Sequence, residues 1–217
     1  MTLLRPSIPT RDLILQHAVE LIDKRGEAAV KVHEIAAEVC SSTSSIYHYF
    51  GSREGLIEAA QTERFARGSL AMDVTIAPAF LAAQTKEEFR EAVIMLHEVS
   101  FDPMVMPRRL MRVNTVGSVL GRPQLAREMG EIQNQLQTLF ASTLRPAQER
   151  GWIRSDVDVR TLASWTMGQL FGRVLIELGE STTSSEEWNR LALEAALFHY
   201  FGETPSSEKI YEGVILN

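Results

Sequence analysis

The 217-residue sequence contains one cysteine, Cys40, so it cannot form an internal disulfide framework. A single thiol fits a reducing compartment. Cys40 could be a reactive sensor thiol, but a small buried turn residue is the favoured interpretation. The sequence also lacks any apolar run that approaches the roughly 20 residues needed to span a bilayer, and residues 1–11 lack the apolar core of a signal peptide. We therefore expect a cytoplasmic protein.

Motifs of the common catalytic sites are missing as well. The sequence has no glycine-rich phosphate loop, no Cys-x-x-Cys, no His-Glu-x-x-His and no nucleophile elbow. His33 and Glu34 are not followed by a second histidine at metal spacing, and the serine cluster at residues 41–45 has only His48 as a nearby base. We expect neither an enzyme nor a bound metal or cofactor.

Basic charge is also scarce. The net charge is −6, and the first 55 residues do not reverse it. Proteins that bind nucleic acid through general electrostatics usually carry a basic excess. Any nucleic-acid binding by this chain must therefore come from a local arrangement of side chains, with modest affinity for non-specific DNA. The contents of 45% hydrophobic and 23% charged residues are ordinary for a globular protein that buries a core.

The most informative stretch begins at Val32. Apolar residues recur at helical spacing from Val32 to Val39 and predict one buried face of a short helix. A polar break follows. Within it Ser42 is a suitable N-cap for a second helix over residues 43–50, and Gly51 can end that helix.

This second helix is expected to present hydrogen-bonding groups outward. It should bury little more than Ile46, Tyr49 and Phe50. No Asp or Glu occurs between Glu38 and Glu54, which suits a surface that faces phosphates. The outer face carries small hydroxyls, a phenol and an imidazole, from Thr43, Ser44, Ser45, Tyr47 and His48.

Two short helices joined by a tight turn, the second with a polar and acid-free face, form the helix-turn-helix geometry that places a recognition helix in the DNA major groove. We expect Tyr47 and Arg53 to contact phosphates, and the hydroxyls to approach base edges or backbone. His48 should lie at the groove wall. The predicted DNA-binding residues are Ser42, Thr43, Ser44, Ser45, Tyr47, His48 and Arg53.

The stretch resembles the TetR family of bacterial one-component transcriptional regulators. The resemblance rests on Arg11-x-x-Ile14-Leu15-x-x-Ala18, Gly26, Val32-x-x-Ile35-Ala36 and, above all, Ser42-x-x-Ser45-Ile46-Tyr47-His48-Tyr49-Phe50-Gly51-Ser52-Arg53-Glu54-Gly55-Leu56. The last run is highly specific. The chain departs from the family pattern at Lys31, Cys40, Ser41 and Thr43-Ser44, where the family usually has Ser or Thr, Gly, an apolar residue and often Pro-Gly. Lys31 removes a helix cap worth about 1 kcal/mol.

The resemblance implies an all-α fold of two domains. An N-terminal three-helix helix-turn-helix DNA-binding domain would occupy residues 1–52, and a larger C-terminal helical ligand-binding and dimerisation bundle would occupy residues 53–217. It further implies a homodimer that binds a palindromic double-stranded DNA operator, most often as a repressor, and that a small molecule releases. In the family, the helix that follows residue 53 connects the two parts.

Beyond residue 52 the sequence predicts a connecting helix over residues 53–72 and two final helices over residues 159–179 and 185–201. A loop is expected around Pro78, and Pro146 should kink or interrupt the long helix that Pro123 opens. Arginines at positions 108, 109 and 112 could clamp an anionic ligand, but a solvated helix face is the favoured interpretation.

The helix over residues 159–179 is apolar on two sides, which indicates burial on two sides. Its glycine pair, four residues apart, would let another helix approach closely. A central helix inside one bundle would also explain the pattern, but the family resemblance places a dimer interface at the last two helices. The predicted interface residues are Trp165, Gly168, Gly172, Ile176, Trp188, Leu191, Ala195 and Phe198.

Apart from Met1, every methionine lies between positions 72 and 167. Flexible thioethers suit a pocket that adapts to apolar molecules, and they suit an ordinary helical core equally well. The family resemblance favours the pocket and, with it, a small hydrophobic effector. The predicted ligand-binding residues are Met95, Leu96, Val99, Met111, Asn114, Leu136, Phe140, Met167, Leu170 and Phe171.

Two alternative functions remain open. A protein partner, in place of a small molecule, could control the DNA-binding state of a helical regulator. The chain could also be a helix-bundle small-molecule-binding protein without DNA binding, although the intact helix that bears Tyr47 argues against this. Release of bound DNA by a compound would separate control by a small molecule from control by a protein.

Overall fold

The computed structural model describes residues 9–179 and 182–202, with the backbone alone for residues 69–75. These residues form helices and connecting turns with no strand, so the predicted all-helical fold is confirmed. The chain divides into two compact units. The N-terminal unit comprises Met1–Gly68 and Asn114–Ile132, and the C-terminal unit comprises Ser69–Val113 and Gln133–Asn217. The functional boundary expected at residue 52 stays a prediction.

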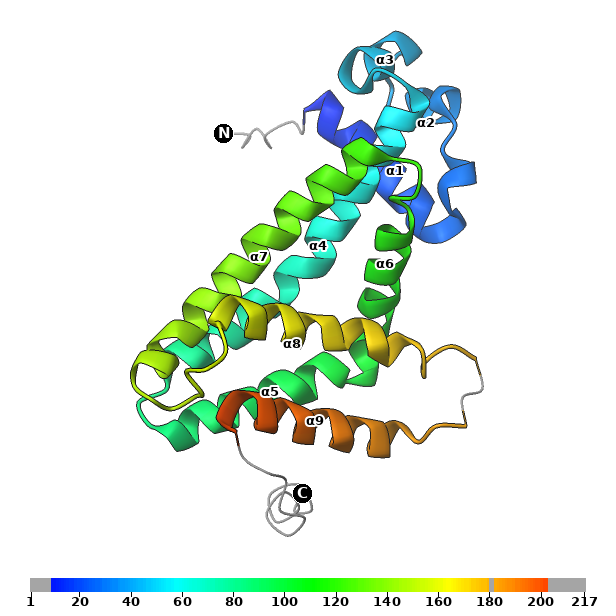
Figure 1. Ribbon diagram of the computed structural model, residues 1–217. Helices are drawn as coiled ribbons and strands as arrows, with labels where there is room; N and C mark the ends of the chain where they lie inside the picture. Colours follow the sequence, from blue (N-terminus) through cyan, green and yellow to red (C-terminus); the bar gives the residue numbers. More distant parts are fainter. Residues whose placement is uncertain (1–8, 180–181, 203–217) are drawn as a thin grey trace, which may run out of the picture. The chain divides into compact units, whose positions relative to one another are not determined.

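The N-terminal unit begins with a cluster of short helices that pack on one another (Figure 1). Their apolar faces meet in a core that includes Ile14, Ile35, Ile46 and Leu56, none of which is exposed to solvent. The elements are α1 (Thr10–Arg25), η1 (Glu27–Ala29), α2 (Val32–Glu38), α3 (Thr43–Phe50) and the first turns of α4 (Arg53–Ala82). This is the predicted helix-turn-helix with α3 as its second helix.

Local signals set the ends of α3 as the sequence predicts. The Ser42 hydroxyl accepts a hydrogen bond from the backbone N–H of Ser45 at 3.0 Å and caps the helix. Gly51 ends it with a φ of 72°, a conformation that glycine adopts without a steric cost. Lys31 precedes α2 without a side-chain cap, as expected from its departure from the family pattern.

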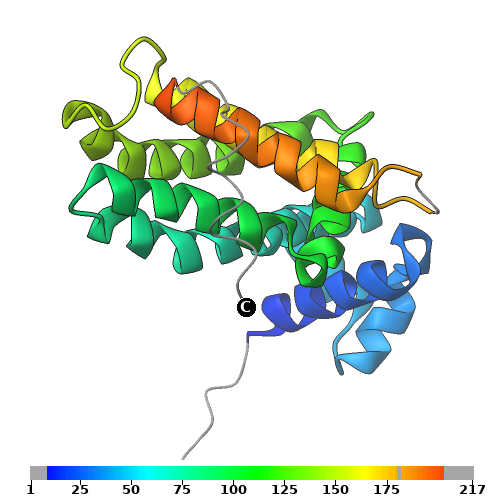
Figure 2. The same ribbon diagram turned by 90° about the horizontal axis from the view of Figure 1, so that it is seen from below.

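The C-terminal unit contains the remaining helices. These are α5 (Lys86–Phe101), η2 (Pro103–Val105), α6 (Met106–Gly117), α7 (Pro123–Glu149), α8 (Val159–Val174) and α9 (Ser185–Phe201), of which α6 and α7, like α4, also contribute residues to the N-terminal unit. Helices α5, α8 and α9 pack on one another in both views (Figures 1 and 2). Their core includes Phe80, Phe89, Leu144 and Tyr200. No helix within the described ranges has the length and apolar content needed to cross a membrane.

The loop predicted around Pro78 is wrong, because α4 continues through Pro78 to Ala82. Ile76, Phe80 and Ala83 are buried in the core of the C-terminal unit at helical spacing. Their burial outweighs the loss of the one backbone hydrogen bond that a proline cannot donate. The expected end of the connector, Met72, has a side chain that lies outside the described residues.

Two other predictions concern helix ends. Helix α7 continues through Pro146 to Glu149, so the predicted interruption is wrong and the alternative, a kink at Pro146, stays a prediction; Leu144 and Ala147 are buried on either side of the proline. Helix α8 ends at Val174, before the predicted residue 179. Its last turn tightens into bonds between residues three apart, such as the one from the N–H of Glu177 to the carbonyl of Val174.

The junction between α3 and α4 leaves no room for a side chain at Gly55. A Cβ atom there would lie 2.1 Å from the carbonyl oxygen of Phe50. Gly55→Ala should therefore lower the free energy of unfolding by about 1 to 3 kcal/mol, measured by urea denaturation at fixed protein concentration. Gly130→Ala is the matched control, since Gly130 is also helical but has open space around it, and it should raise stability by about 0.5 to 1 kcal/mol. Equal effects of the two substitutions would contradict the close contact.

Candidate functional site

The outer face of α3 is polar, and one apolar side chain of the helix is buried in the core of the N-terminal unit. Ile46 is fully buried, whereas Tyr47 is 49% exposed. Thr43, Ser44 and His48 are exposed as well. The predicted row of hydroxyl, phenol and imidazole groups thus lies on one accessible helix surface, and no acidic residue of α3 interrupts it.

The serines at the start of α3 are already linked to one another. The Ser42 Oγ lies 3.1 Å from the Ser44 Oγ and 2.8 Å from the Ser45 Oγ. Ser42 also caps the helix and Ser45 is half-buried. These two hydroxyls therefore already make hydrogen bonds within the protein and are less available to a partner. Ser44 and Thr43 are the small hydroxyl side chains that the helix leaves most accessible.

Arg53 lies at the start of α4 and is tied to the backbone of the preceding turn. Its Nε donates to the carbonyl of Val30 at 2.6 Å, and its Nη2 donates to the carbonyl of Glu27 at 2.8 Å. Its Nη1 has no hydrogen bond to the described residues. The guanidinium is therefore held in a fixed place at the surface, with one nitrogen available.

Two expectations about this region are wrong. Tyr49 is 43% exposed in place of the expected burial, although it lies three residues after the fully buried Ile46 and so close to the same helix face. Cys40 is an exposed turn residue and not a buried one. It adopts a φ of 52°, in the left-handed region where the family pattern has glycine, because the turn between α2 and α3 demands that conformation.

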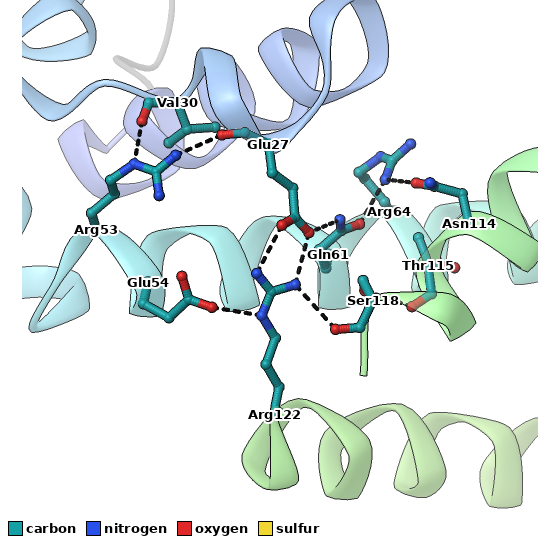
Figure 3. A network of polar contacts seen from close by, with 10 residues as sticks. All are labelled: Glu27, Val30, Arg53, Glu54, Gln61, Arg64, Asn114, Thr115, Ser118 and Arg122. Carbon is teal, nitrogen blue, oxygen red and sulfur yellow. Dashed lines mark hydrogen bonds and ion pairs between the residues drawn. The ribbon is translucent and has the colours of Figure 1, made fainter. Parts of the chain in front are cut away.

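Elsewhere in the N-terminal unit, Arg122 joins three segments of the chain (Figure 3). Its Nη1 and Nη2 donate to the two carboxylate oxygens of Glu27 at 2.8 and 2.7 Å, and its Nε donates to Glu54 at 2.6 Å. Nη1 also reaches the carbonyl of Ser118 at 3.0 Å. The hydrogen bond from Arg122 is the largest influence on Glu27 and lowers the pKa of its carboxyl group, although burial opposes the shift.

A second arginine extends the network toward α6. Gln61 donates to Glu27 at 2.6 Å and accepts from Arg64 at 2.6 Å. Arg64 also donates to Asn114 at 2.9 Å and to Asp23 at 2.7 Å. The network connects α1, η1, α4 and the residues between α6 and α7. Sequence reasoning did not find it, because its partners lie up to 95 residues apart and no local pattern marks them.

The C-terminal unit contains a small cavity among α5, α8 and α9. Its volume is about 30 Å³, and it is lined by residues that include Leu96, His97, Gln169 and Leu170. Burial lowers the pKa of His97 to about 4, although its hydrogen bond to the carbonyl of Asn189 opposes the shift. The imidazole is therefore uncharged at neutral pH.

The structure brings only some of the predicted ligand-binding residues to this cavity. Leu96 and Leu170 line it. Met95, Val99 and Phe140 pack against the neighbouring core, and Leu136 and Met167 are buried. Met111 and Phe171 are half-buried. Asn114 belongs to the N-terminal unit, where it accepts from Arg64.

The predicted interface residues lie on α8 and α9 and just beyond α8, and several are open to solvent. Gly168 and Gly172 are exposed, and a Cβ at Gly168 would meet nothing within 4 Å. Leu191 and Phe198 are exposed large apolar side chains on α9. Trp165, Ile176, Trp188 and Ala195 are half-buried. Exposed Leu175 adds to the apolar surface and was not predicted.

Comparison with known proteins matches these features to a family. Residues 14–60 match the family model described as bacterial regulatory proteins, tetR family. Over 188 residues the chain is 23% identical to the HTH-type transcriptional regulator UidR of Escherichia coli, covering 87% of each protein. The matched residues 14–60 are those that form the helix-turn-helix and the start of α4.

Solved structures show the same fold. A putative TetR-family transcriptional regulator from Mesorhizobium loti has a TM-score of 0.65 at 20% identity, over 88% of this chain and 96% of that chain. A putative transcriptional regulator from Saccharomonospora viridis, in complex with choline, has a TM-score of 0.60 at 19% identity, over 87% and 95%. The similarity in each case extends over nearly the whole of the solved chain.

The Arg122 network leads to a prediction about stability and pH. Arg122→Met should lower the free energy of unfolding at neutral pH by about 2 kcal/mol, because the partly buried Glu27 loses its charged hydrogen bonds. A carboxyl group whose folded pKa is lowered stabilises the protein above its unfolded pKa, and this contribution is lost as the pH falls through the folded pKa. The difference between wild type and Arg122→Met should therefore shrink in acid.

Urea denaturation across this pH range provides the measurement. Arg127→Met is the matched control, because Arg127 is an exposed arginine on α7 whose substitution should change stability by less than about 0.5 kcal/mol. A difference between wild type and Arg122→Met that stays constant from neutral to acidic pH would contradict the role of Glu27.

Proposed function

Because the chain is a DNA-binding transcriptional regulator of the TetR family of bacterial regulatory proteins, we propose that it represses transcription as a homodimer and leaves its operator when a small effector binds. The observation that carries this proposal is the surface of α3. It exposes hydroxyl, phenol and imidazole groups over a buried Ile46, at the start of a unit whose fold matches that of known regulators.

Each exposed group of α3 has a proposed role on DNA. Tyr47 donates its phenolic hydrogen to a phosphate, which fixes the register without reading sequence. Arg53 supports a second phosphate contact through its available Nη1 and the N–H groups at the start of α4. Thr43 and Ser44 approach base edges or backbone, and His48 lies at the groove wall.

The apolar surface of α8 and α9 supports dimerisation. Leu191, Phe198 and Leu175 expose large apolar side chains on one protomer, and the open space at Gly168 would admit a second helix. Exposed large apolar side chains on neighbouring helices favour protein association when they gather in one patch. We assign this surface to a second copy of the chain, because a palindromic operator requires two recognition helices related by a two-fold axis.

The cavity among α5, α8 and α9 is the proposed place for the effector. Its volume of about 30 Å³ is far below the 300 to 1,000 Å³ of typical ligand pockets, so a guest must separate these helices. Binding would then favour a different arrangement of the C-terminal unit, and only that preference can release DNA. The choline of the Saccharomonospora viridis complex is not carried over, because this unit buries arginines that would repel a cation.

Selection of bound sequences from random duplex DNA tests the DNA-binding role. We expect an inverted repeat whose half-sites lie about 34 to 36 Å apart or a multiple of that. Compounds that release the selected DNA would then establish effector control. Failure to enrich any sequence would contradict the proposal.

Tyr47→Phe should weaken binding to the selected operator and to unrelated DNA alike, by about tenfold, since one charged hydrogen bond contributes about 1.5 kcal/mol. Tyr49→Phe is the matched control, because residues two apart on a helix face different directions. Ser44→Ala should change the sequence preference instead. Affinities are measured by fluorescence anisotropy at constant salt. Unchanged affinity of Tyr47→Ala would remove α3 from the role of recognition helix.

Gly168→Leu should convert the dimer to monomers that bind the operator poorly, because a large side chain fills the space open to the second helix. Sedimentation velocity at micromolar protein concentration measures the change. Gly117→Leu is the matched control, since Gly117 is also helical, exposed and free of neighbours, yet lies on α6. A wild-type monomer with full operator affinity would contradict the assignment of the interface.

A further inference from the structure

The C-terminal unit buries three arginines that the sequence alone places on a solvated helix face or does not single out. Arg109 and Arg112 on α6 and Arg173 at the end of α8 are each at most 4% exposed. Arginine is seldom buried, and a buried cation is stable only when other groups pair with it. The groups around each guanidinium therefore show whether its charge is balanced within the chain.

Arg109 is fully paired. Its Nε donates to the Oε2 of Glu177 at 3.0 Å, and its Nη2 donates to the Oε1 of the same carboxylate. Its Nη1 donates to the carbonyls of Ser100 at 2.6 Å and Asp102 at 3.2 Å. Arg112 is also engaged, since its guanidinium lies over the ring of Phe171 and within 3.4 Å of Gln133.

Arg173 differs from both. Its Nε and Nη1 are buried and have no hydrogen-bond acceptor among the described residues. The Oε1 of Glu177 lies 4.0 Å from its Nε and already accepts from Arg109. Burial lowers the pKa of Arg173, the charge of Glu177 opposes this, and the charge of Arg109 adds to it. Glu177 therefore has two arginines beside it and can balance only one.

The surroundings of Arg173 lead to the cavity among α5, α8 and α9. The guanidinium stacks on the ring of Trp188, which packs in one apolar cluster with Phe101 and Leu170. Phe101 and Leu170 also line the cavity. Asn189, the residue after Trp188, has a buried Oδ1 without a donor. Unsatisfied groups of both kinds, two donors and one acceptor, thus lie in the same part of the unit.

The N-terminal unit offers a useful contrast. A larger open cleft of about 620 Å³ lies beside Arg122 and is lined by Glu27, Glu54 and Gln61. The charged groups that line it hydrogen-bond to one another, so none of Glu27, Glu54 and Arg122 lacks a hydrogen-bond partner. Size alone would favour this cleft, but the buried donors of Arg173 are the ones without an acceptor among the described residues.

We propose that Arg173 forms a subsite for the anionic group of an organic ligand, a carboxylate or a phosphate, whose apolar body occupies the cavity among α5, α8 and α9. The identification of this ligand as the effector rests on the proposed function. The cavity volume of about 30 Å³ is that of a water molecule in the liquid, so the body of the ligand must enter by moving the helices apart. The donors of Arg173 thus bind the anionic group of the ligand whose apolar body changes the packing of α5, α8 and α9.

Arg173→Met tests the unmatched charge directly, without any ligand. Methionine has a similar length and no charge, so the variant should raise the urea concentration at the midpoint of unfolding, because apolar replacement of a poorly paired buried ion stabilises a protein. Arg160→Met is the matched control, since Arg160 is an exposed arginine on the same helix, and it should leave the midpoint unchanged. A strong loss of stability in Arg173→Met alone would show that the chain itself balances the charge, which would overturn the proposal.

Ligand charge is tested on the full-length wild type with three compounds of nearly equal shape, benzoate, benzyl alcohol and benzylammonium, together with phenyl phosphate and hexanoate, at constant ionic strength. The anions should raise the thermal unfolding midpoint in the millimolar range, and benzylammonium should not. The apparent affinity for the anions should fall about tenfold or more in Arg173→Met and stay unchanged in Arg160→Met. No stabilisation of wild type by any of these anions, or equal stabilisation of wild type and Arg173→Met, would overturn the subsite.

The same compounds are then added to the protein bound to its selected operator. Anion binding that depends on Arg173 supports the subsite whether or not the DNA is released. Binding without release contradicts effector control alone, and failure to select any DNA contradicts the proposed regulation alone. The two proposals can therefore fail separately.

Discussion

The hydrogen bonds of Arg122 fix the alignment of the N-terminal unit. Apolar contacts such as those of Phe65 with Leu125 bring segments together, but they are non-directional and tolerate small shifts. A planar guanidinium, in contrast, requires its acceptors in set directions. Glu27 precedes the helix-turn-helix, Glu54 lies in the first turn of α4, and Arg122 immediately precedes α7 (Figure 3). One side chain thereby sets the register of three segments that the sequence keeps far apart.

The parts of the structure that could be predicted are those determined within a few residues. Ser42 caps α3 by accepting a bond three residues on, and Gly51 ends the helix because its backbone takes a positive φ. Ile46 is buried because a short helix of this pattern has one apolar face. The identity of the fold and the exposed surface of α3 followed from such signals, and from the family resemblance that the same residues carry.

The parts that could not be predicted depend on residues distant in the sequence. Pro78 lies inside α4 because the core buries Ile76 and Phe80, and no local pattern states that this burial exceeds the cost of the proline. The pattern around Arg109 predicts a solvated basic cluster, yet Arg109 is buried and pairs with the carboxylate of Glu177, which lies 68 residues later in the sequence. The predicted ligand-binding set likewise combined residues of two units, since spacing along a helix does not tell which neighbour it meets.

The contact at Gly55 has a mechanical consequence. A joint made of side chains can absorb a small displacement when those side chains change rotamer. The atom that a side chain at Gly55 would meet first is the backbone carbonyl of Phe50, which has no rotamer to change, and the next neighbour is the Ser52 hydroxyl, which accepts from the Gly55 N–H. The end of α3 and the first turn of α4 are therefore joined closely by backbone, and a tilt of that turn would be passed on to α3.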